Sequence, residues 1–124
     1  TSISGSSMYI KGSIVTYSNE AKMKFLDVDK EILDTKGAVS PEVAKQMAEG
    51  VRKAVGSDIG VGITGIAGPT GGTDKKPVGL VYIAVAGKDN TVVKENIFSG
   101  DRARVRYRST QQALEMIRQY IKNK

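Results

Sequence analysis

The chain has 124 residues, 40% of them hydrophobic, with a formal net charge of +6 and neither histidine nor cysteine. This length fits one globular domain, which buries roughly two thirds of its unfolded surface without needing disulfides. Without histidine and cysteine the chain cannot form a Ser-His-Asp triad, a thiolate nucleophile or a histidine-ligated metal site, so a catalytic base must be a carboxylate, a tyrosine or a lysine.

The first predicted elements are a strand and a helix. Residues 11–17 are rich in β-branched and aromatic side chains and predict a short strand that ends at Tyr17. Ser18 or Asn19 is a suitable N-cap for a helix that runs to about Leu26, with an acidic residue in its first turn.

Two further helices are expected before the next strand. A short helical turn is predicted over residues 30–34 and stops before Gly37. The next helix begins with Ser40 as N-cap and proline at its first position, and apolar residues then recur every three or four positions. Gly56 is its expected C-cap.

The second half of the chain predicts three strands and a long helix. Residues 58–64 alternate β-branched residues with glycines, which suggests close approach of a helix or ligand to the backbone. Residues 79–86 are almost continuously apolar, as in a strand covered on both faces, and form a β-hairpin with residues 91–98. Helical spacing returns over residues 101–122. The whole pattern predicts an α/β fold with three layers, in which a mixed β-sheet is flanked by helices on both faces.

The positive charge is concentrated near the C-terminus, at Arg102, Arg104, Arg106, Arg108, Arg118, Lys122 and Lys124. A solvated helix face is the simplest interpretation of this cluster. The aromatic residues do not alternate with these cations. On a helix Arg102 and Arg106 share one face while Arg104 and Arg108 point well away from it, so no single stripe would face a duplex, and the pattern argues against nucleic acid as a partner. No segment has the length and hydrophobicity of a membrane span or a signal peptide, and we expect a cytoplasmic protein.

Three segments carry candidate site residues. Tyr17 and Lys22 lie where a strand is expected to lead into a helix, and burial or the helix dipole would lower the pKa of that lysine toward the range of a base. Residues 64–73 contain four glycines and three threonines, whose N–H and hydroxyl groups suit an anion. Arg102 follows at the start of the last helix and is able to bind a carboxylate or phosphate. Taken singly, each segment has a plain structural explanation.

In combination, these segments resemble a known family. The sequences at 17–22 (YSNEAK), 37–40 (GAVS), 64–72 (TGIAGPTGG), 76–79 (KPVG) and 100–102 (GDR) are similar to the C-terminal domain of the competence/damage-inducible protein A family. The similarity runs in order from about residue 6 to the C-terminus. It implies a nicotinamide-nucleotide amidase, which deamidates nicotinamide mononucleotide to nicotinate mononucleotide and ammonia without a metal or other cofactor.

The resemblance also assigns roles to individual residues. It implies that Lys22 is the catalytic base and that Tyr17 relays a proton or orients the lysine. Substrate contacts are implied for Ser18, Asn19, Thr64, Gly65, Gly68, Gly71, Gly72 and Arg102, with Arg102 placed to meet the phosphate.

One part of the family pattern is missing from this sequence. The serine nucleophile of the family lies in a Glu-Ser-Cys-Thr-Gly-Gly-like motif upstream of the position that matches Thr1. Since Thr1 is not an initiator methionine, we expect residues 1–124 to be a single amidohydrolase domain without its N-terminal nucleophile segment, and to be inactive alone.

An alternative class of function uses the same residues. The glycine-rich loop and Arg102 would equally serve a non-catalytic nucleotide- or partner-binding module linked to competence or DNA damage, in which Tyr17 and Lys22 are structural. In either case we expect a small-molecule ligand, and the apolar hairpin 79–98 offers an edge for a homo-oligomer.

Overall fold

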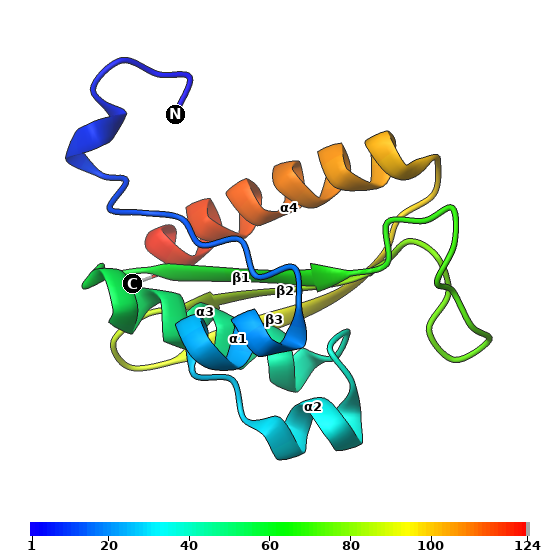
Figure 1. Ribbon diagram of the computed structural model, residues 1–124. Coiled ribbons are helices and arrows are strands. Elements are labelled where there is room, and N and C mark those ends of the chain that lie inside the picture. Colours follow the sequence, from blue (N-terminus) through cyan, green and yellow to red (C-terminus); the bar gives the residue numbers. More distant parts are fainter. Residues whose placement is uncertain (124) are drawn as a thin grey trace.

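The centre of the structure is a sheet of three strands, β1 (Gly60–Gly65), β2 (Leu80–Ala86) and β3 (Thr91–Ile97), paired antiparallel in the order β1-β2-β3. The structure is a computed structural model in which residues 1–123 are described. One face of the sheet is covered by α4 (Arg102–Lys122) and the other by α3 (Pro41–Val55), onto which α1 (Asn19–Leu26) and α2 (Lys30–Lys36) pack (Figure 1). The predicted α/β fold with helices on both faces is confirmed.

The middle strand is buried on both faces, as its composition predicts. On one face, Val81, Ile83 and Val85 pack against α4 in a cluster that includes Val105 and Met116. On the opposite face, the small side chains of β2 meet those of α3, at Ala84, Ala86, Ala44 and Ala48. Alternate residues of one strand therefore join the two helical layers.

The glycines of β1 allow α3 to approach the sheet closely. A Cβ atom built at Gly60 would overlap the carbonyl of Ala48, and one built at Gly62 would meet the carbonyl of Ala44. The expectation that a helix backbone or a ligand approaches these glycines is confirmed for the helix.

The helix ends follow the predicted signals. Ser18, Ser40 and Asp101 are N-caps whose side chains accept hydrogen bonds from backbone N–H groups in the first turn. Gly56 caps α3 with a left-handed conformation, φ 66°. The short turn expected over residues 30–34 is a helix two residues longer, α2.

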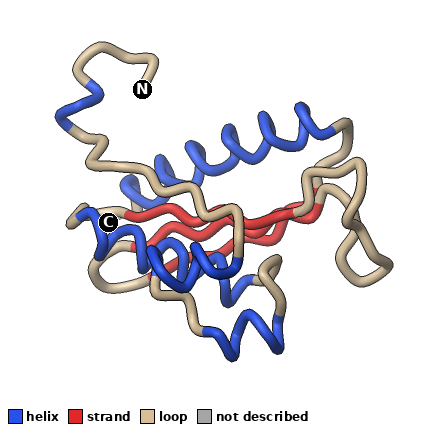
Figure 2. The backbone as a smooth tube through the Cα atoms, viewed as in Figure 1, coloured by secondary structure: helices blue, strands red, loops and turns tan. Residues whose placement is uncertain are grey.

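The strand predicted over residues 11–17 is wrong. This segment is extended but pairs with no strand, and it runs beside the β1 edge of the sheet (Figure 2). Ile14 packs against the cluster between α1 and α3, whereas Val15 is 83% exposed. This segment packs on helices and forms no hydrogen-bond ladder with the sheet. The three strands of the described residues are all antiparallel. The parallel pair that a mixed sheet requires is therefore not present among them.

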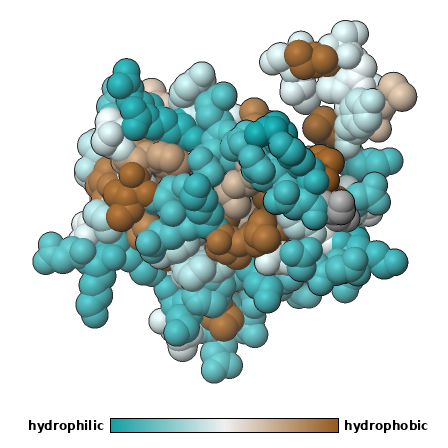
Figure 3. All heavy atoms as spheres, turned by 180° about the vertical axis from the view of Figure 1, so that it is seen from behind, coloured by the Kyte–Doolittle hydropathy of each residue, from teal (hydrophilic) through white to brown (hydrophobic). Residues whose placement is uncertain are grey.

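Exposed apolar residues occur at the N-terminus, on the last strand and on α4. The N-terminal segment stands away from the body of the domain (Figure 1), and hydrophobic atoms are visible on this projection from behind (Figure 3). Within this segment Ile3, Met8 and Tyr9 are more than 70% exposed. On β3, the outer strand opposite β1, Ile97 is 67% exposed, and this edge is where the expected self-association would take place. Across residues 1–123, none of the helices combines the length and hydrophobicity needed to cross a membrane.

Candidate active site

A long groove follows the free edge of β1. Its volume is about 1190 Å³, and it is bounded by residues 8–17, by β1 and by side chains of α1, α3 and α4. Five of the predicted site residues line it: Tyr17, Lys22, Thr64, Gly65 and Arg102. The groove therefore brings together residues from the three segments that the sequence singled out, which are up to 85 positions apart (102 minus 17).

Lys22 is the buried cation of this groove. Its side chain is in the second turn of α1, only 7% of the residue is exposed, and Nζ donates a hydrogen bond to the Thr16 carbonyl oxygen at 2.8 Å. No aspartate or glutamate among residues 1–123 forms an ion pair with it. Burial lowers the pKa of Lys22 from its ordinary value of 10.5, because the charged amine loses hydration without gaining a counter-ion.

Tyr17 lies at the mouth of the groove and is 87% exposed. Among the described residues, its hydroxyl makes no hydrogen bond to Lys22, whose amine is bonded instead to the preceding residue, Thr16. The structure therefore contains no hydrogen bond between the Tyr17 phenol and the Lys22 amine. The role of Tyr17 in proton transfer stays a prediction.

Thr64 connects the groove to the start of α3. The residue is 7% exposed, and its hydroxyl donates a hydrogen bond to the carbonyl oxygen of Ala38 at 2.7 Å. Gly65, the last residue of β1, is opposite Val81 of β2, whose side chain would clash with a Cβ at this position. The end of β1 is thus held in place by the sheet on one side and by the α2–α3 connection on the other.

The glycine-rich loop that follows β1 is fixed at two points. Arg102 Nη1 donates a hydrogen bond to the carbonyl oxygen of Gly68 at 3.0 Å, which joins the loop to the first turn of α4. Lys76 Nζ donates one to the carbonyl oxygen of Lys36 at 2.6 Å, at the end of α2. The exposed Gly71 and Gly72 lie between these points and do not line the groove.

Two other predicted contacts lie outside the groove lining. Ser18 is the N-cap of α1 and accepts a hydrogen bond from the backbone N–H of Ala21 at 3.1 Å. Asn19 is the first residue of that helix and is exposed. In the structure Ser18 and Asn19 begin the helix that carries Lys22. A contact of either residue with substrate stays a prediction.

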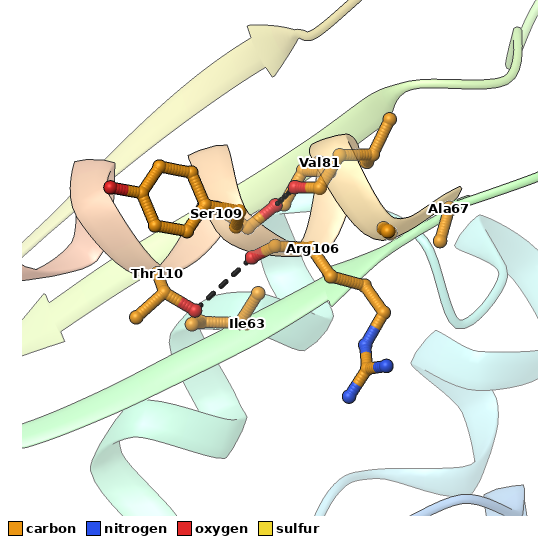
Figure 4. Close-up of a pocket in the computed structure, with 10 residues that line it drawn as sticks. Ile63, Ala67, Val81, Arg106, Ser109 and Thr110 are labelled. Atoms are coloured by element: carbon orange, nitrogen blue, oxygen red, sulfur yellow. Dashed lines mark hydrogen bonds between the residues drawn. The ribbon is translucent and has the colours of Figure 1, made fainter. Parts of the chain in front are cut away.

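A smaller cavity of about 460 Å³ lies between the sheet and α4 (Figure 4). The hydroxyls of Ser109 and Thr110, which line it, donate hydrogen bonds to carbonyl oxygens of their own helix. Arg106 borders both this cavity and the groove. Within residues 1–123 there is no group of three or more carboxylates that could hold a metal ion.

Comparison with known proteins gives the family. Residues 1–121 match the family model described as the CinA C-terminal domain. The chain belongs to the CinA family. A competence-damage relative from Moorella thermoacetica is 56% identical over 94% of this chain, and a CinA-like protein from Syntrophomonas wolfei is 52% identical over 99% of it.

The solved structures of CinA proteins have the same fold. The competence/damage inducible protein CihA from Agrobacterium tumefaciens superposes with a TM-score of 0.91 at 41% identity, over 93% of this chain and 71% of that one. The chain spans 28% and 30% of the two curated relatives, so this CinA domain is a small part of those longer proteins.

Arg106 and Thr16 are two of the groove residues in this CinA domain that were not among the predicted site residues. Arg106 lies one helical turn from Arg102 on the same face of α4, and this spacing was a usable signal. Thr16 is 8% exposed and also lines the groove. Its burial depends on how the extended segment packs against helices, which the local sequence does not reveal.

Proposed function

We propose that this CinA domain belongs to an amidohydrolase that deamidates nicotinamide mononucleotide to nicotinate mononucleotide and ammonia. The observation that carries the proposal is the buried Lys22 amine, which lines a groove, has no carboxylate partner among residues 1–123 and has a lowered pKa. Because its pKa is lowered, such a lysine is uncharged over a wider pH range than an ordinary lysine and is better suited to act as a general base. The family resemblance supplies the substrate.

The hydrogen bond of Lys22 suits this role. A neutral amine that donates one hydrogen to the Thr16 carbonyl keeps its lone pair available for a proton. The nucleophile would be the serine that the family carries upstream of the position matching Thr1. Lys22 would take the proton of that hydroxyl as the serine oxygen attacks the carboxamide carbon.

The remaining steps follow from this transfer. Protonated Lys22 returns the proton to the amide nitrogen, the carbon–nitrogen bond breaks, and ammonia leaves an acyl-enzyme. Water then adds to the acyl carbon and gives a proton to Lys22, which returns it to the serine oxygen as the carbon–oxygen bond breaks and nicotinate mononucleotide is released. One amide and one water give one acid and one ammonia, so no oxidant or reductant is required.

The test is the reaction of the intact protein. Incubation with nicotinamide mononucleotide should release ammonia and nicotinate mononucleotide in equal amounts. If the protein binds this nucleotide but forms neither product, the binding-module alternative is correct and the hydrolase proposal is wrong.

Arg102 is expected to recognise the substrate phosphate. Its guanidinium already binds the loop through Gly68, and a guanidinium has further N–H groups to offer. Changing Arg102 to lysine in the intact protein should raise KM for nicotinamide mononucleotide roughly tenfold, because a lysine cannot hold both partners in a fork geometry.

Nicotinamide riboside, which lacks the phosphate, provides the control substrate. Its KM should change much less in the Arg102→Lys variant, so the ratio of the two KM values identifies the phosphate contact. Arg104→Lys, on the neighbouring exposed position of α4, is the matched variant and should leave both values unchanged. An equal rise for both substrates would show that Arg102 acts only through the loop.

A further inference from the structure

Thr16 carries a buried hydroxyl without a partner. The residue is 8% exposed, and its Oγ1 atom has no hydrogen bond within residues 1–123. The other buried serine and threonine hydroxyls are all bonded to backbone carbonyls: Ser40 to Gly37, Thr64 to Ala38 and Ser109 to Val105. Thr16 is therefore the exception among the buried hydroxyls of the described chain.

An unpartnered buried hydroxyl is unfavourable for folding. Valine has the same shape and would fill this position without an unsatisfied polar atom, so a threonine here is not explained by packing. In native proteins most buried polar side-chain atoms have a hydrogen-bond partner in the protein or in ordered water, so the unpartnered hydroxyl of Thr16 calls for an explanation.

The position of Thr16 indicates where that partner would lie. Thr16 lines the groove together with Lys22 and Thr64, and its own carbonyl oxygen holds the Lys22 amine at 2.8 Å. A ligand atom bonded to the Thr16 hydroxyl would therefore lie beside the proposed base. Thr16 is a residue of the groove wall whose buried hydroxyl is both donor and acceptor, whereas Arg102 supplies a guanidinium to the same groove.

We propose that the Thr16 hydroxyl binds the carboxamide group of the substrate and holds it beside Lys22. An uncharged carboxamide has one acceptor and two donors, which suits a buried hydroxyl, whereas the anionic phosphate suits the exposed Arg102. This inference rests on the proposed function, and it adds a substrate-binding residue to the site.

Kinetics of the intact protein test the inference. Thr16→Val and Thr16→Ala both remove the hydroxyl, and each should raise KM for nicotinamide mononucleotide at least tenfold. Thr16→Ser restores a hydroxyl and should recover most of the wild-type KM. Thr35→Val is the matched control, because this threonine lies on α2 outside the groove, and its KM should be that of the wild type.

Thermal unfolding separates binding from folding. Since the hydroxyl has no partner in the domain, Thr16→Val should unfold at the wild-type Tm or above it, even as its KM rises. A wild-type protein that hydrolyses the nucleotide while Thr16→Val and Thr16→Ala keep its KM overturns the Thr16 inference alone. A change in kcat without a change in KM also overturns it, because the hydroxyl would then act on the nucleophile. A wild-type protein inert toward the nucleotide overturns the proposed function as well.

Discussion

Replacing Lys22 by methionine in the intact protein is expected to lower kcat for nicotinamide mononucleotide hydrolysis by about two to four orders of magnitude, the usual contribution of a general base. Methionine has a similar length and no charge, so it fills the same buried position on α1. The Thr16 carbonyl loses one hydrogen bond, but no carboxylate of residues 1–123 is left unpaired. The folded state should therefore persist, and a steady-state ammonia assay measures the loss of activity.

Lys24 provides the matched control. It lies on the same helix, is exposed and places its Nζ 5.4 Å from the ring centre of Phe25. Lys24→Met should retain wild-type kcat. If Lys22→Met also retains it, the lysine-base mechanism is wrong, whatever the substrate proves to be.

The pH dependence of the same two proteins gives an independent check. Because burial lowers the pKa of Lys22 below 10.5, the wild-type rate should rise with pH as this amine loses its proton at a pH below that of an ordinary lysine. The unfolded chain binds this proton more tightly than the folded one, so the free energy of unfolding should also rise with pH between the lowered pKa and 10.5. In Lys22→Met, the contribution of the Lys22 amine should disappear from the pH profile of the rate and from that of the free energy of unfolding. In Lys24→Met, both contributions should remain.

The sequence predicts the elements whose pattern is local. The α3 boundaries follow from Ser40, proline and Gly56, and the burial of β2 follows from its continuous apolar run, since both depend on neighbouring residues alone. Residues 11–17 have the composition of a strand, yet a strand requires a partner, and pairing is decided by tertiary structure. The lowered pKa of Lys22 was expected from its position, but its hydrogen bond to Thr16 depends on the same packing of residues 11–17.

Gly62→Ala is expected to lower the free energy of unfolding by about 3 kcal/mol, at the upper end of the usual range for overpacking a core. The added methyl group would lie 2.5 Å from the Ala44 carbonyl oxygen and 2.7 Å from the Ala48 amide nitrogen. Both are backbone atoms of α3, which cannot rotate away as a side chain does. Relief therefore requires that the whole helix move outward from the sheet.

Such a movement would also reach the site. The start of α3 follows Ala38, whose carbonyl oxygen accepts the hydrogen bond of Thr64 at the edge of the groove. Gly62→Ala should thus reduce activity as well as stability, although Gly62 itself does not line the groove. Urea denaturation measures the first effect and the ammonia assay the second.

Gly12→Ala is the control for Gly62→Ala, because its added methyl group would meet only the side chain of Val55, at 3.1 Å for the nearer atom. That side chain is able to adjust, and the free energy of unfolding should stay within about 1 kcal/mol of the wild-type value. If Gly62→Ala were equally well tolerated, α3 would have to lie farther from β1 than described. The glycines of β1 would then need another explanation, such as contact with a ligand.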